Sequence, residues 1–149
     1  MRGKNIKTLI MLTAIVYMLF EAYSFECKAA GADDVLAYMN AARAEAGLPA
    51  YTVDETLQEA ATTRAAECAS RFSHTRPNGK AWYTVSSSSK GENLAHARNV
   101  EQSNPENVVL AWMLSPKHKA NVMRQNFSYV GIAYYDNGCG DIYIACEFK

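Results

Sequence analysis

The chain has 149 residues, and its 15 basic and 15 acidic side chains give a formal net charge of zero. No basic patch stands out, which argues against nucleic acid as a partner, because phosphate binding needs clustered cations. The length suits one domain of ordinary size after removal of a short leader.

The first residues have the pattern of a secretory signal peptide. A basic start over residues 2–7 precedes an apolar run from Thr8 to Phe20. This run is shorter than the roughly 20 residues that span a bilayer core. Small residues around Ala30 favour cleavage there, although an earlier cut or an uncleaved anchor stays open. We therefore predict a signal peptide over residues 1–30 and one extracellular domain over residues 31–149 that does not span the membrane.

Four cysteines, Cys27, Cys68, Cys139 and Cys146, are spaced in no pattern typical of zinc sites. Export permits disulfides, so we expect one bridge, with its partners left open because three pairings are possible. If Cys27 leaves with the leader, one of the remaining thiols is odd.

Helical signals dominate the first half of the domain. Asp33 or Asp34 is expected to cap a helix that Gly47 ends. Asp54 is expected to cap a second helix, whose apolar stripe is interrupted by Arg64. That arginine either pairs with a buried carboxylate or extends outward to solvent.

A long loop is expected over residues 73–90, which lack periodicity. Residues 92–97 are then expected to form a short helix, on which Glu92 and His96 would meet at a four-residue spacing. Ser103 or Asn104 is expected to cap the next helix, and Ser115, before Pro116, a further one.

The end of the chain changes from helical to alternating periodicity. Large residues alternate over 130–134 and again over 142–148, with the turn sequence DNGCG at 136–140 between them. This pattern predicts a C-terminal β-hairpin. Helices first and antiparallel strands last indicate the α+β class, without alternating βαβ units.

Five segments in this order resemble the bacterial branch of the CAP superfamily, which comprises cysteine-rich secretory proteins, antigen 5 and pathogenesis-related 1 proteins. Residues 39–49 look like the first helix of the family and its exit. The other segments read FSH at 72–74, GEN at 91–93, W-x-x-S-x-x-H-x-x-N at 112–121 and VGI at 130–132. The resemblance implies an α-β-α sandwich with a central antiparallel sheet flanked by helices.

The resemblance also implies a shallow cleft lined by His74, Glu92 and His118, with Asn93 and Ser115 beside it. Animal members carry a second glutamate where this chain has Ser115, so the family's set of two histidines and two acids is incomplete here. Ser115 has its own structural interpretation as a helix N-cap.

Two imidazoles and one carboxylate can supply three ligands to Zn²⁺ or another divalent cation and leave one position for water. His74, His118 and Glu92 are therefore the tentative metal ligands, although a hydrogen-bonded network without metal is the alternative. The main hypothesis is a secreted binding module whose partners, by family resemblance, would be a lipid, a sterol or a cell-envelope protein. The alternative is an extracellular metal-assisted hydrolase, a peptidase, with Glu92 as candidate base.

Overall fold

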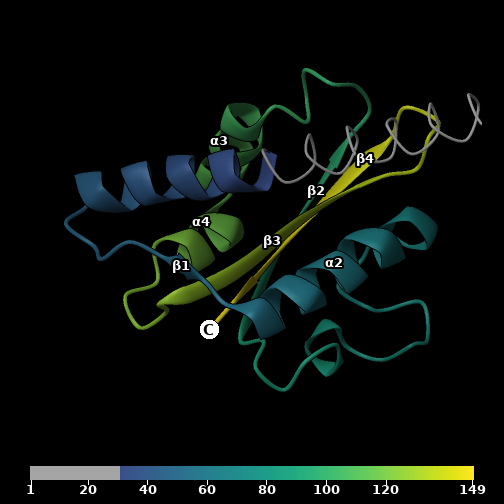
Figure 1. Cartoon of the computed structure of the whole chain (residues 1–149), viewed down its shortest axis with the longest axis horizontal. Coiled ribbons are helices and arrows are strands. Elements are labelled where there is room, and N and C mark those ends of the chain that lie inside the picture. Colours follow the sequence, from purple (N-terminus) through teal and green to yellow (C-terminus); the bar gives the residue numbers. More distant parts are fainter. Residues whose placement is uncertain (1–30) are drawn as a thin grey trace, which may run out of the picture.

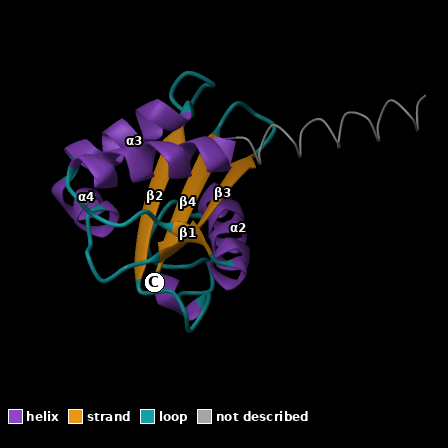
Figure 2. Cartoon of the chain, turned by 60° about the vertical axis from the view of Figure 1, so that its left-hand side comes forward, coloured by secondary structure: helices purple, strands orange, loops and turns teal. Residues whose placement is uncertain are grey.

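The computed structural model describes residues 31–149 as three layers (Figure 1). A sheet lies between helix α2 on one face and three further helices on the other, as Figure 2 shows. These three are a helix over residues 31–45, α3 and α4. The predicted α-β-α sandwich is therefore confirmed, whereas the predicted leader, its cleavage site and Cys27 lie outside the described residues.

The elements follow one another along the chain with short connections, except for the long loop before β2. After the helix over 31–45 come β1 (Thr52–Val53), α2 (Glu55–Ser70), a 3₁₀ turn (Trp82–Thr84), β2 (Gly91–Ala97), α3 (Pro105–Leu114), α4 (Pro116–Val122), β3 (Tyr129–Asp136) and β4 (Ile142–Phe148). The sheet order is β1-β3-β4-β2. All neighbours are antiparallel except the two-residue β1, which runs parallel to β3.

The predicted C-terminal hairpin is confirmed. Strands β3 and β4 pair from Val130 with Phe148 to Asp136 with Ile142. In the turn, Gly138 and Gly140 have φ angles of 75° and 96°, which glycine adopts without steric cost. The Oδ1 atom of Asp136 also accepts a hydrogen bond from the Gly138 amide at 2.7 Å.

The observed helix N-caps confirm the sequence-based predictions in part. The side chain of Asp54 caps α2 and that of Asn104 caps α3, as predicted. Ser115 occupies the N-cap position of α4, but its side chain makes no capping hydrogen bond. The prediction that Asp33 or Asp34 caps the first helix is wrong, because that helix is already formed at residue 31.

The predicted short helix over residues 92–97 is also wrong. These residues form β2, which pairs with β4 along its whole length from Gly91 to Ala97. A single helical turn is costly to nucleate, whereas the strand gains a full ladder of hydrogen bonds from a partner far away in the sequence. The expected contact between Glu92 and His96 is absent, and His96 Nε2 instead lies 2.8 Å from Oδ1 of Asp141.

Two apolar clusters, one on each face of the sheet, hold the layers together. The larger cluster joins the sheet to the helix over 31–45, α3 and α4, and it contains Cys146. The smaller cluster joins the sheet to α2 and contains Cys68. Because the sheet separates these two thiols and Cys139 is exposed, the expected disulfide is not formed among the three cysteines of residues 31–149.

Candidate binding cleft

A hollow of about 340 Å³ collects residues from three distant parts of the sequence. The loop after α2, the start of β2 and helix α4 all border it. The structure thus brings His74, Glu92 and His118 together. The full lining consists of His74, Trp82, Lys90, Gly91, Glu92, Lys117, His118 and Asn121.

The Glu92 carboxylate lies at the base of the cleft, on the side of β2 that faces α2, and it is only 4% exposed. The buried Arg64 donates to it from Nε to Oε2 at 2.6 Å. Burial by itself would raise the pKa of Glu92, but hydrogen bonds from His74 and Arg64 outweigh it and hold the pKa below its usual range. Of the two alternatives for Arg64, the structure shows the pairing with a buried carboxylate.

Arg64 is itself fixed by two further acceptors. Its Nη1 donates to Oε2 of Glu67 at 2.7 Å, and its Nη2 donates to the carbonyl of Ser73 at 2.7 Å. Since Ser73 directly precedes His74, the same guanidinium holds both the carboxylate and the backbone beside the histidine. Arg64 therefore connects α2 to the cleft.

The ring of His74 is oriented by Glu92 and open to solvent. Its Nδ1 lies 2.7 Å from Oε1 of Glu92, while 55% of the side chain is exposed. The acceptor oxygen assigns the proton to Nδ1, which leaves the lone pair of Nε2 available in the neutral ring. Glu92 therefore acts toward His74 as a carboxylate acts toward a metal-ligating histidine, fixing its tautomer and direction.

His118 is held at the cleft by two asparagines. Asn93, fully buried on β2, donates from Nδ2 to the His118 carbonyl at 3.1 Å. Asn121 on α4 donates to Oδ1 of Asn93 at 3.0 Å, and this closes the connection between strand and helix. Burial, followed by the nearby His74, lowers the pKa of His118, so its ring is neutral at pH 7.

Two of the residues predicted beside the cleft are not part of its lining. Asn93 lies behind the surface and positions α4, as described above. Ser115 lies at the junction of α3 and α4 and is absent from the residues that border the hollow.

The structure does not form the predicted three-ligand metal site. Within residues 31–149, no group of three His, Cys, Asp or Glu side chains is placed to hold a metal ion. Both oxygens of Glu92 accept hydrogen bonds from His74 and Arg64, which turn the carboxylate towards these donors. The ligands that fit a divalent cation are therefore reduced to two, the imidazoles of His74 and His118.

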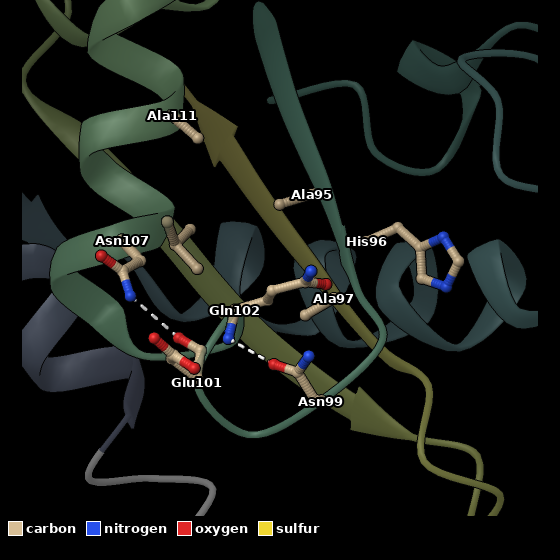
Figure 3. A pocket seen from close by; sticks show the side chains of 9 residues that line it. Ala95, His96, Ala97, Asn99, Glu101, Gln102, Asn107 and Ala111 are labelled. Carbon is tan, nitrogen blue, oxygen red and sulfur yellow. Dashed lines mark hydrogen bonds between the residues drawn. The ribbon is translucent and has the colours of Figure 1, made fainter.

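A second and larger hollow, of about 560 Å³, lies between β2, α3 and the loop that joins them (Figure 3). Its polar side chains are three amides, the carboxylate of Glu101 and the ring of His96, and several of these residues bind one another, as when Asn107 donates to the Glu101 carbonyl at 2.9 Å. His96 borders it, but its ring stacks on Tyr143 with centroids 4.6 Å apart and bonds to Asp141. This hollow therefore holds a single imidazole, whereas the first cleft holds two, and the first cleft is the better candidate site.

Two lysines that border the cleft, Lys90 and Lys117, were not predicted from the sequence. Trp82, from the long loop over residues 73–90, also borders the cleft. Arg64 was visible as a charge within an apolar stripe. Glu147 is likewise a charge within an alternating strand, in which Tyr143 and Ala145 on the same face belong to the cluster under α2. A charged residue within an otherwise apolar stripe is therefore the sequence signal that points to both Arg64 and Glu147.

Comparisons with known proteins agree on one family and fold. Residues 36–148 match the profile of the Cysteine-rich secretory protein family. The protein YkwD of Bacillus subtilis is 32% identical over 112 residues, which cover 70% of this chain and 42% of YkwD. The chain thus spans less than half the length of this relative.

Solved structures show the same fold at low sequence identity. An extracellular protein of Bacillus anthracis that contains an SCP domain superposes with a TM-score of 0.67 at 16% identity, over 82% of this chain and 41% of that one. The crystal structure of NaASP2 with Zn²⁺ gives a TM-score of 0.59 at 16% identity, over 79% and 78% of the two chains. In residues 31–149, no helix has the length and apolar character needed to cross a membrane.

Proposed function

Because the chain belongs to the Cysteine-rich secretory protein family, we propose that it is an exported binding module whose cleft binds a divalent cation through His74 and His118. Export is supported by the extracellular B. anthracis relative and by the signal-peptide pattern of residues 1–30. By family resemblance, the partners of such a module outside the cell would be a lipid, a sterol or an envelope protein.

One observation carries the proposal: an exposed imidazole is fixed by a buried carboxylate. The 2.7 Å contact between His74 Nδ1 and Glu92 leaves Nε2 as the free nitrogen of a ring that cannot turn without breaking this hydrogen bond. The second imidazole, His118, borders the same hollow. A ligand nitrogen must be deprotonated to bind metal, and the lowered pKa of His118 meets this condition at pH 7.

The cation would supply positive charge and open coordination positions for an oxygen ligand of the partner. The protein's part is to hold the two rings. Lys90 and Lys117 border the same hollow and oppose the binding of a cation, although they also favour an anionic partner group. Because two imidazoles lie beside two ammonium groups, we expect the cation to bind weakly and reversibly.

Hydrolysis is less well supported, because the candidate base Glu92 is engaged by Arg64 and His74. Its lowered pKa makes it a poor proton acceptor at neutral pH. We therefore assign Glu92 the role of a positioning residue and not that of a metal ligand.

Calorimetric titration of the purified mature protein with Zn²⁺ tests the metal proposal. We expect saturable binding in the wild type, and at least a tenfold loss of affinity in the His74→Ala/His118→Ala double variant. His96→Ala is the matched control, since His96 is the third histidine of the chain and also pairs with a carboxylate, Asp141. Unchanged affinity in the double variant, or a wild type that does not bind, would exclude the proposed ligands.

A further inference from the structure

A second buried carboxyl group lies directly beside Glu92. Glu147 on β4 is the register partner of Glu92 on β2, and both are buried, at 0% and 4% exposure. Directly paired residues of antiparallel strands have Cβ atoms about 4.5–5.5 Å apart, on the same face of the sheet. At that distance two ionised carboxylates repel each other strongly, so one of them is expected to keep its proton.

The hydrogen bonds show which of the two is ionised. Glu92 accepts from Arg64 and His74, as an ionised carboxylate does. Within residues 31–149, neither oxygen of Glu147 has a hydrogen-bond donor, and the equally buried hydroxyl of Ser89 beside it makes no hydrogen bond either. An ionised Glu147 would be a buried charge without a donor, which is very unfavourable. A protonated Glu147 needs only an acceptor.

Arg64 and Arg76, the two cations whose charge acts on Glu147, are both engaged by other acceptors. The guanidinium of Arg64 is shared among Glu92, Glu67 and the Ser73 carbonyl. Arg76 is bound to Glu67 at 2.7 Å. On the other side, β3 presents Gly131, which has no side chain. The titratable and charged groups that act on Glu147 are thus Glu92 on β2, Arg64 on α2, Arg76 in the following loop, and the thiol of Cys146 beside it on β4.

We propose that Glu147 is a positioning residue of the cleft, whose protonated carboxyl group donates a hydrogen bond to Glu92 and so holds the carboxylate that orients His74. This inference extends the proposed function, because it concerns the group that fixes one of its two imidazoles. Burial, and after it the charge of Glu92, raises the pKa of Glu147 to about 9, which agrees with a protonated carboxyl group. The result is a chain of contacts from a neutral interior acid to an exposed ring.

The first test compares the pH dependence of unfolding in the wild type and Glu147→Gln. Glutamine keeps the size of the side chain and can donate an N–H to Glu92, but it cannot ionise. The native Glu147 has a raised pKa, so between about pH 4.5 and 9 the native state binds a proton that the unfolded state has lost. The contribution of Glu147 to the free energy of unfolding is therefore complete below about pH 4.5 and decreases as the pH rises towards 9.

We expect the urea midpoint of the wild type to fall, relative to that of Glu147→Gln, at each step from pH 5 to pH 9. Parallel midpoints over this range would show that Glu147 is ionised in the native state and would overturn the proposal. A measurement on the wild type gives the same decision if the variant does not fold. In protein labelled with ¹³C at the glutamate carboxyl carbons, the Glu147 signal should have the shift of a protonated acid at pH 7, and an ionised shift there would contradict the proposal.

The second test separates positioning from simple packing by reading the His74 ring. In ¹⁵N spectra, Glu147→Gln should keep the proton of His74 on Nδ1, as in the wild type. Glu147→Leu, which has no donor, should shift His74 toward a mixture of tautomers. An unchanged His74 tautomer in Glu147→Leu would show that Glu147 does not act through Glu92. Neither test involves a metal, so failure of Zn²⁺ binding and failure of this inference are distinguishable.

Discussion

At the scale of single residues, the cleft depends on buried charges that fix the orientation of the His74 ring. Arg64 and Glu92 are both fully desolvated side chains, and they contact each other at 2.6 Å. A buried ion pair of this kind contributes little net stability, but breaking it is costly because one charge is left without a partner. The pair therefore gives the His74 ring a fixed direction that an apolar pair of the same size could not give.

Removing Arg64 should destabilise the protein far more than removing an exposed arginine. We expect Arg64→Met to lower the free energy of unfolding by about 3–5 kcal/mol, because Glu92 is left as an uncompensated buried charge. Arg98→Met is the control, since Arg98 is exposed, and should change stability by less than about 0.5 kcal/mol. Urea denaturation at pH 7 measures both, and equal small losses would contradict the assigned role of Arg64.

At the scale of elements, the site depends on how closely α2 packs on the sheet. A Cβ atom built on Gly131 of β3 would lie 2.1 Å from the carbonyl carbon of Leu57 and 2.2 Å from the amide nitrogen of Gln58. Such distances leave room for no side chain. The absence of a Cβ at this position lets α2 lie directly on β3, and it brings Arg64 within reach of Glu92.

Adding one methyl group at this contact should push the two layers apart. We expect Gly131→Ala to cost about 3 kcal/mol, at the upper end of overpacking effects, because backbone atoms must move. Gly91→Ala is the contrast, since its Cβ would meet the Phe127 ring at 2.9 Å, and a side chain can shift. Thermal unfolding of both variants checks this, and a smaller loss for Gly131→Ala than for Gly91→Ala would contradict the packing argument.

At the scale of elements, the separation in sequence between interacting residues explains which elements could be predicted from the sequence. The hairpin and the caps at Asp54 and Asn104 were predicted correctly, because their signals lie within a few neighbouring residues. Strand β2 was not, because its conformation depends on pairing with β4, whose sequence lies about 50 residues further on. The ordered motifs led to His74, Glu92 and His118. The carboxyl pair of Glu92 and Glu147 exists only through strand register, which the sequence pattern did not specify.

At the scale of the whole molecule, two apolar clusters stabilise a sandwich that needs no disulfide among the described residues. Cys68 and Cys146 are buried on opposite faces of the sheet, and Cys139 is exposed in the hairpin turn. Burial raises the pKa of Cys68 to about 11 and that of Cys146 well above its usual range. Neither buried thiol is therefore reactive in the native state.

Thiol chemistry should reflect this arrangement in protein that begins at residue 31, the predicted mature start. We expect a thiol reagent to label only Cys139 before unfolding and all three cysteines in urea, and we expect the melting temperature to be the same with and without a reductant. Mass spectrometry and calorimetry measure these outcomes. A lower melting temperature under reducing conditions would indicate a bridge that this fold does not contain.

The central claim is that two distant histidines share one ligand-binding cleft, and imidazole NMR tests it most directly. The chain has three histidines, so a ¹⁵N-labelled sample titrated with Zn²⁺ reports on every ring at once. We predict that the ring signals of His74 and His118 shift together with one saturation curve, while those of His96 stay in place. Separate curves for His74 and His118, or a response from His96 alone, would contradict a shared site.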